Sequence, residues 1–231
     1  MDAEANPTQI SLKWFEIWRI AILHPTVETF SRIISDPKAG IKWGIIWIAI
    51  STFIAWFFGL QSVVVNNFAA QFPYQAYSNI LLVGAIVASI IGVIALLFAA
   101  AISRGLARLF GGAGTFYQLF YCWAVISLPF TLLSVLGFRF PYLIPSYSSF
   151  IFSTAGMIIQ AISLMICVGV NLYQLYAMIV ALSAVEKLGI WKSFIILILQ
   201  AFAVGVAITC LCSGFQALIM NYARRISCLM C

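Results

Sequence analysis

The residues best placed to act together form one polar stripe within a long apolar run. Their spacings of three and four residues put them on one face of a helix. The stripe consists of Gln160, Ser163, Cys167, Asn171 and Gln174. A weaker polar face, with Thr209, Ser213 and Gln216, follows in the last apolar run. Polar groups that face lipid are costly, so the stripe should face protein or water. Hydrogen bonds between helices are the simpler interpretation, and a polar cavity is the alternative.

A glycine-rich segment, Arg104–Thr115, loosely resembles a loop that holds an anion with its backbone N–H groups. It lacks the Lys-Ser/Thr pair that completes a phosphate-binding P-loop. We therefore expect its glycines to make a turn between two membrane spans. We expect Arg104 and Arg108 to reach towards the membrane interface, and a specific lipid-headgroup site is the alternative.

The other reactive side chains form no recognisable catalytic or metal site. His24 is the only histidine, and neither an acidic residue nor a thiol lies beside it in sequence. Cys228 and Cys231 have CxxC spacing, but the second pair needed for a four-ligand zinc site is missing. We expect no catalytic residue, no metal and no cofactor, and therefore no enzyme activity.

The composition indicates that lipid is the solvent of this chain. Hydrophobic residues make up 64% of its 231 residues and charged residues only 8%, whereas soluble domains carry about 25% charged residues. The net charge of +6 does not indicate nucleic-acid binding, because the basic residues flank apolar runs, as in membrane proteins.

Five apolar stretches are long enough to span a bilayer, which takes about 20 helical residues. They cover residues 43–64, 80–103, 116–138, 156–182 and 193–220. Lipid cannot satisfy an open backbone, so these spans must be helices. We predict an all-α integral membrane protein with a bundle of five transmembrane helices in residues 42–222 and a tail at 223–231.

The N-terminal residues read differently. We expect residues 1–9 to form a disordered tail, whereas residues 10–41 repeat apolar residues at helical spacing, with Trp14 and Trp18 among them. This pattern predicts short amphipathic helices that lie in the membrane interface. A cytosolic helical pair packed on the bundle is the alternative.

The basic residues also predict orientation. With the N-terminus inside, nine Lys and Arg residues fall on the cytoplasmic side and three outside. The positive-inside rule then favours a cytoplasmic N-terminus and an external C-terminus, although Arg224 and Arg225 in the tail argue the other way.

The second span carries small residues at three-to-four spacing, which lets helices approach closely. They are Gly84, Ala88, Gly92, Ala95 and Ala99. Packing within the bundle is the simpler interpretation, and a dimer contact is the alternative. No Asp, Glu, Lys, Arg or His lies inside a predicted span, which argues against an ion-coupled transporter but not against a passive pore.

Two groups of residues resemble the Yip domain family of membrane proteins, which interact with Ypt/Rab GTPases. The first is His24-Pro25-Thr26-Val27-Glu28-Thr29-Phe30 with Asp36-Pro37, and the second is Gly111-Gly112-Ala113-Gly114-Thr115-Phe116 with Gln118, Tyr121 and Pro129. The resemblance covers roughly residues 20–215. It implies a five-helix bundle with a cytosolic N-terminus and the C-terminus across the membrane. The chain lacks the Asp-Leu-Tyr-Gly-Pro motif of eukaryotic members, so it resembles the prokaryotic branch, and Rab binding does not follow.

These patterns lead to one functional hypothesis and two alternatives. We expect a non-enzymatic scaffold or accessory protein of Yip type in a prokaryotic plasma membrane. It would contact the bilayer and a membrane-protein partner or a second copy of itself. The alternatives are a passive channel or transporter for a small neutral solute or lipid, and an accessory subunit of a larger respiratory or photosynthetic complex.

Overall fold

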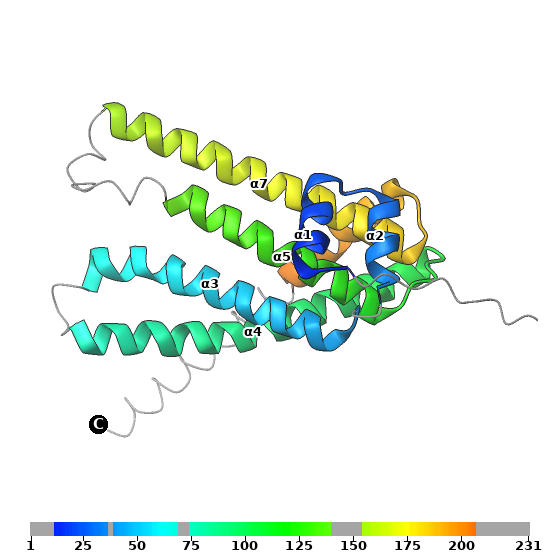
Figure 1. The fold of residues 1–231 in the computed structure, drawn as a ribbon, viewed down its shortest axis with the longest axis horizontal. Helices are drawn as coiled ribbons and strands as arrows, with labels where there is room; N and C mark the ends of the chain where they lie inside the picture. Colours follow the sequence, from blue (N-terminus) through cyan, green and yellow to red (C-terminus); the bar gives the residue numbers. More distant parts are fainter. Residues whose placement is uncertain (1–11, 37–38, 69–73, 140–153, 207–231) are drawn as a thin grey trace, which may run out of the picture.

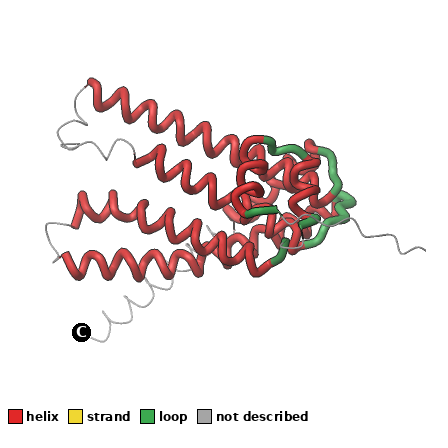
Figure 2. The backbone as a smooth tube through the Cα atoms, viewed as in Figure 1, coloured by secondary structure: helices red, strands yellow, loops and turns green. Residues whose placement is uncertain are grey.

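The computed structural model describes residues 12–36, 39–68, 74–139 and 154–206. Every regular element among them is a helix (Figure 2). In chain order these are α1 (Trp14–Leu23), α2 (Val27–Ile34), α3 (Ile41–Phe68), α4 (Tyr74–Leu109), α5 (Phe116–Arg139) and α7 (Thr154–Glu186). A shorter apolar helix, Ile190–Val206, follows.

Four of these helices are long and apolar enough to cross a membrane, namely α3, α4, α5 and α7. The helix Ile190–Val206 covers the start of the fifth predicted span, and the rest of that span lies outside the described residues. The predicted all-helical membrane bundle is therefore confirmed.

The first two helices are short because each has its own start and stop signals. At the start of α1, the Glu16 carboxylate accepts a hydrogen bond from the backbone N–H of Lys13 at 3.0 Å. At the start of α2, the Thr26 hydroxyl accepts one from the N–H of Thr29 at 3.2 Å, as an N-cap residue does. Pro25 lies between the two helices.

Both short helices pack their apolar faces on one end of the bundle (Figure 1). Ile17 and Ala21 of α1 and Phe30 and Ile33 of α2 are buried. The polar faces remain outside. Contact of these faces with lipid headgroups stays a prediction.

Helix α5 is the centre of the bundle. Residues 119–130 are buried without interruption, as expected for a helix that is hydrophobic on all sides. The helix packs against α3, α4 and α7. Pro129 lies inside it, and the helix continues to Arg139.

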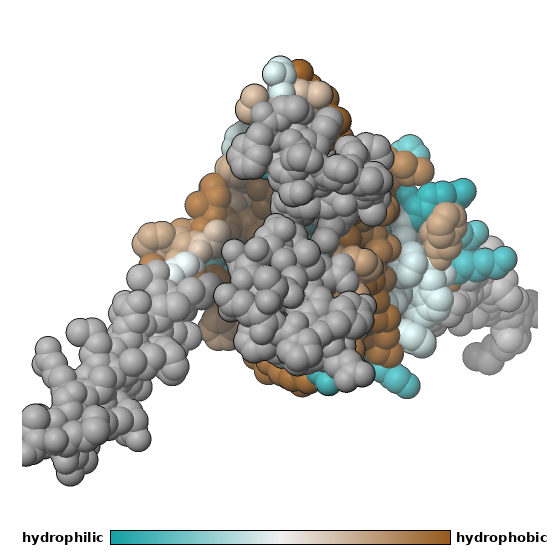
Figure 3. All heavy atoms as spheres, turned by 90° about the vertical axis from the view of Figure 1, so that its left-hand side faces the viewer, coloured by the Kyte–Doolittle hydropathy of each residue, from teal (hydrophilic) through white to brown (hydrophobic). Residues whose placement is uncertain are grey.

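Helices α4 and α7 lie on the outside and leave large apolar side chains uncovered. The exposed residues of α4 include Ile90, Ile94 and Phe98, and those of α7 include Leu164 and Met165. Figure 3 shows hydrophobic side chains along the flanks of the bundle. A surface of this kind is stable against hydrocarbon rather than water.

Candidate functional site

Two regions of the bundle gather polar groups: a cluster at the end that carries α1 and α2, and a cavity between the spans. The polar cluster begins where α4 ends. The N–H of Gly112 donates to the carbonyl of Ala107 at 2.8 Å, and the N–H of Gly111 donates to that of Arg108 at 3.1 Å. Gly111 has φ +86°, so this is a Schellman cap, in which glycine takes the left-handed conformation.

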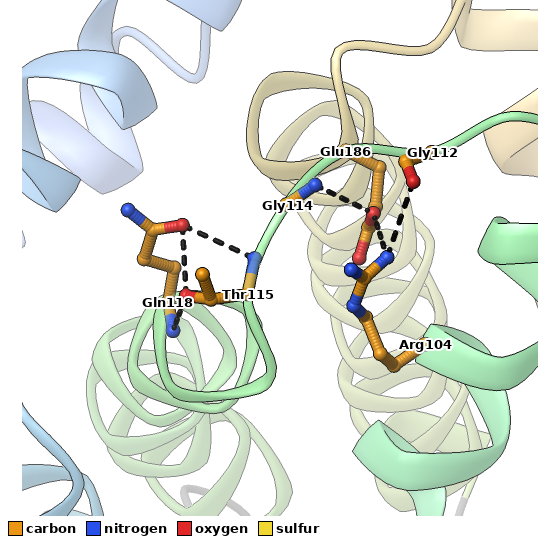
Figure 4. Close-up of polar contacts among 6 residues, drawn as sticks. All are labelled: Arg104, Gly112, Gly114, Thr115, Gln118 and Glu186. Atoms are coloured by element: carbon orange, nitrogen blue, oxygen red, sulfur yellow. Dashed lines mark hydrogen bonds and ion pairs between the residues drawn. The ribbon is translucent and has the colours of Figure 1, made fainter.

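The loop that follows this cap holds the carboxylate of Glu186, the last residue of α7 (Figure 4). Arg104 Nη1 lies 2.7 Å from Glu186 Oε2, and the N–H of Gly114 donates to the same oxygen at 3.0 Å. The N–H of Ala113 donates to the Glu186 backbone carbonyl at 3.1 Å. The loop thus connects two helices, and together with Arg104 it holds a carboxylate of the same chain.

Glycine is required in this loop because α7 approaches it so closely. A Cβ on Gly114 would lie 2.3 Å from the backbone oxygen of Val185. A Cβ on Gly112 would lie 2.6 Å from Glu186 Oε2. Real Cβ atoms do not approach other atoms this closely, so side chains here would push α7 away from the loop.

The next residues start α5 with a reciprocal cap, also drawn in Figure 4. The Thr115 hydroxyl accepts a hydrogen bond from the N–H of Gln118 at 3.4 Å, and Gln118 Oε1 accepts one from the N–H of Thr115 at 3.2 Å. This is a capping box. The motif residues from Gly111 to Gln118 therefore end one span, hold Glu186 and begin the next span.

The residues expected at the membrane interface lie at this same end of the molecule. Trp14 contacts Trp43 and Trp47, with ring centroids 4.7 and 4.8 Å away, and Trp18 contacts Trp47 at 5.7 Å. Arg108 is exposed. Arg104 forms an ion pair with Glu186 and so links α4 to α7. The sequence alone did not indicate this contact.

The small-residue stripe of α4 lies only partly along its packed side. Ala88 is buried, and a Cβ on Gly92 would lie 2.3 Å from Thr52 Cγ2, which places α4 directly against α3. Gly84 and Ala99 are half-buried, whereas Ala95 is exposed. The role of the whole stripe in helix packing stays a prediction.

The polar stripe of α7 divides between two surroundings. Ser163 is buried, and the Cys167 thiol lies 3.9 Å from the carbonyl oxygen of Ser134 on α5. Gln174 lines a cavity. Gln160 and Asn171 are exposed on the outside of the chain. The residues Thr209, Ser213, Gln216, Cys228 and Cys231 lie outside the described residues.

The cavity has a volume of about 720 Å³ and lies among α3, α4, α5, α7 and the helix Ile190–Val206. Its lining combines hydroxyl and amide side chains with small and aliphatic ones. The polar members are Ser51, Thr52, Ser127, Thr131, Gln174 and Gln200. Among the described residues of the lining none is charged, so the cavity suits hydrogen bonding to a neutral molecule.

Sequence reasoning missed two features of these sites. Glu186 is the only acidic residue after Asp36, and it directly follows a long apolar run. A single carboxylate at the end of a membrane span is a signal that it pairs with a basic residue such as Arg104. The hydroxyls of Ser51 and Thr131 lie 2.6 Å apart. Ser127, Thr131 and Ser134 are spaced by four and three residues, so a hydroxyl face on this span was a signal that could have been followed.

Comparison with known proteins decides the family. A family model described as the Yip1 domain matches residues 20–211. The chain belongs to the Yip1 domain family. The match extends from the end of α1 to beyond Val206, so the Yip1 domain contains both the Glu186 cluster and the cavity. The resemblance noted in the sequence is thus confirmed. No match is found among curated proteins or solved structures.

Proposed function

We propose that this Yip1-domain protein is a non-enzymatic scaffold or accessory protein of a prokaryotic plasma membrane, and that it binds a membrane-protein partner through one face of α7. The observation that carries this proposal is the exposure of two amides, Gln160 and Asn171, within a membrane span.

The two amides lie on the same line along α7. They are eleven residues apart, which is about three turns of a helix and leaves them about 20° apart around its axis. Between them lie Leu164 and Val168, which are 61% and 50% exposed. Along this face two exposed aliphatic side chains therefore lie between two exposed amides.

The hydrogen-bonding capacity of this face is largely unused within the described part of the chain. Asn171 Nδ2 donates to the Cys167 carbonyl of its own helix at 2.7 Å, and no hydrogen bond to its Oδ1 is found among the described residues. No hydrogen bond of the Gln160 amide is found within the same part of the chain. Amides exposed to hydrocarbon are costly, and hydrogen bonds between membrane helices contribute about 0.6 kcal/mol each. A partner helix with polar side chains could form hydrogen bonds with both amides, Gln160 and Asn171.

The distribution of basic residues supports a cytoplasmic N-terminus. Figure 1 places α1, α2, the α4–α5 loop and the end of α7 at one end of the bundle. The basic residues at or near that end are Lys13, Arg19, Arg32, Lys42, Arg104, Arg108, Lys187 and Lys192. Arg139 lies at the opposite end of α5. By the positive-inside rule the first end faces the cytoplasm.

The test is the composition and mass of the particle purified in mild detergent from its native membrane. We expect a defined complex, either with another membrane protein or between copies. The double variant Gln160→Leu, Asn171→Leu should release the partner. The variant Gln174→Leu is the matched control, because it makes the same change on the same helix but at a residue that lines the cavity.

The result would also separate the competing functions. Different partner chains in a fixed ratio identify an accessory subunit of a larger complex, whereas a homo-oligomer identifies a contact between copies. A wild-type particle that contains one chain, or a complex that survives the double variant, would contradict the proposed role of this face.

A further inference from the structure

We propose that the cavity lined by Gln174 binds an uncharged lipid through a hydroxyl and a carbonyl group, the chemistry of a diacylglycerol. This ligand site is separate from the partner face, because Gln174 lines the cavity while Gln160 and Asn171 are exposed outside it.

The shape of the cavity suits a molecule that enters from the bilayer. Its volume of about 720 Å³ is within the range of roughly 300–1,000 Å³ found for small-molecule sites. Ser51 and Ser127 at its inner wall are buried, whereas Ala95, Leu175 and Ala201 are exposed. The cavity therefore opens at the side of the bundle, between spans, where lipids diffuse.

Small residues create this space. Ala95 and Ala99 of α4 and Ala201 and Gly205 of the helix Ile190–Val206 contribute little side-chain volume to the lining. Larger side chains at the exposed positions would project into the opening. Leu96 and Leu197 supply apolar wall, which suits the first part of an acyl chain.

The polar groups of the lining can both accept and donate hydrogen bonds. The Ser51 hydroxyl lies 2.6 Å from the Thr131 hydroxyl and 3.4 Å from the Ser127 carbonyl. If Ser51 donates to that carbonyl, Thr131 must donate to Ser51, which leaves the Thr131 oxygen free to accept. A ligand hydroxyl can then donate to Thr131.

Two amides provide the complementary donors. The oxygen of Gln200 accepts a hydrogen bond from Ser103, which leaves the Gln200 NH₂ group available. The Gln174 amide makes no hydrogen bond within the described part of the chain. Amide N–H groups suit an ester carbonyl, and an unpaired amide at an apolar cavity is unfavourable until it is paired.

The charge of the lining selects against phospholipid headgroups. None of the lining residues in the described part of the chain is charged, so a phosphate or a quaternary amine would lose its hydration without gaining a counter-charge from them. A bare acyl chain would leave the Gln174 amide unpaired. A lipid with hydroxyl and ester groups but no charge brings no charged group into the cavity and can pair with the Gln174 amide.

The experiment uses the full chain in phosphatidylcholine nanodiscs that contain diacylglycerol with a photoactivatable acyl chain. After irradiation, mass spectrometry measures how much of the protein is labelled and on which helices. We expect saturable labelling of the spans around the cavity, with competition by unlabelled diacylglycerol. Loss of one hydrogen bond in the variant Gln174→Leu should weaken this competition on the order of fivefold.

Matched variants keep the result interpretable. Gln160→Leu removes an amide of the same helix outside the cavity and should label like the wild type. Thr131→Val preserves shape while removing the hydroxyl, and it tests the same site if Gln174→Leu does not fold. Ala95→Phe should block the opening and abolish saturable labelling.

Two outcomes would overturn the proposal. One is labelling that does not saturate or that is unchanged in Gln174→Leu, Thr131→Val and Ala95→Phe. The other is equal labelling and competition by photoactivatable phosphatidylcholine, which would mean that the cavity takes up any acyl chain. Neither outcome depends on whether α7 has a protein partner.

Discussion

The Arg104 guanidinium and the Glu186 carboxylate form an ion pair with 2.7 Å between Nη1 and Oε2. The pair joins the cytoplasm-facing end proposed for α4 to the last residue of α7. Glu186 is completely buried, and 14% of the Arg104 side chain is exposed. Because water cannot solvate the carboxylate, its charge depends on Arg104 and on the N–H of Gly114.

Removal of Arg104 should therefore destabilise the bundle strongly. The variant Arg104→Met leaves a buried charge without a counter-charge, a change that costs about 3–5 kcal/mol. The double variant Arg104→Met, Glu186→Gln should recover part of this loss, because the neutral amide needs no counter-charge. Unfolding by SDS titration in bicelles, followed by tryptophan fluorescence, measures both changes.

Arg108→Met is the control for this comparison, since Arg108 is exposed at the end of the same helix. A surface substitution of this kind should change the free energy of unfolding by less than about 0.5 kcal/mol. Equal losses in Arg104→Met and Arg108→Met would show that the ion pair does not stabilise the fold.

The second prediction concerns Gly114 in the loop between α4 and α5, where an added methyl group should destabilise the fold. In Gly114→Ala the new Cβ meets the Val185 carbonyl oxygen at 2.3 Å, and this backbone atom cannot move without shifting α7. The shift would also lengthen the hydrogen bond to Glu186, so we expect a loss of about 2–3 kcal/mol in the same unfolding measurement.

Gly189→Ala is the control for the loop, because a Cβ on Gly189 meets nothing within 4 Å. It should leave the unfolding midpoint nearly unchanged. If Gly114→Ala unfolds at the same SDS fraction as Gly189→Ala, the loop and α7 are not in the close contact described above.

The contact between α3 and α4 gives a third prediction. In Gly92→Ala the new Cβ lies 2.3 Å from Thr52 Cγ2 and 2.9 Å from Thr52 Cβ. Rotation of the Thr52 side chain cannot relieve the second contact, so the helices must separate. Overpacking of this size costs about 1–3 kcal/mol. Since Gly92 also lines the cavity, the same variant should alter diacylglycerol labelling.

Gly105→Ala provides the comparison within α4, because nothing lies within 4 Å of a Cβ there. Alanine favours helix over glycine by about 1 kcal/mol, so this variant should be neutral or slightly more stable. A Gly92→Ala protein as stable as Gly105→Ala would mean that the small-residue stripe does not set the distance between α3 and α4.

Much of this fold follows from local properties of the sequence. The apolar runs are long enough to require helices in lipid, and their ends carry local signals. Thr26 and Thr115 cap the helices that follow them, and Gly111 supplies the left-handed residue that ends α4. These interactions join residues close in sequence, so spacing alone indicates them.

The sites could not be predicted to the same extent because they join distant residues. Arg104 and Glu186 are 82 positions apart, and only the folded bundle brings them together. The polar stripe of α7 shares one face by spacing, but the position of α5 decides that Cys167 turns inwards while Gln160 stays exposed. Periodicity gives the face of a helix and not the neighbour that covers it.

The last prediction concerns how α1 is held. Trp47 of α3 is 4% exposed and contacts the rings of Trp14, Trp18 and Tyr121. Its replacement in Trp47→Ala removes a ring that contacts both tryptophans of α1, which otherwise packs mainly on α5. The cost is about 3–5 kcal/mol for a buried tryptophan. We expect α1 to detach, so trypsin should cleave after Arg19, which is exposed on α1, faster than in the wild type.

Trp191→Ala is the control, because Trp191 is 77% exposed and its loss should not speed cleavage. The comparison of detergent with liposomes then separates two forces on α1. If Trp47→Ala is cleaved quickly in both, packing on the bundle holds α1. If cleavage is fast in detergent but slow in liposomes, the amphipathic helix is also held by lipid headgroups, as its pattern of tryptophan and basic residues predicts. Unchanged cleavage in both would contradict the packing role of Trp47.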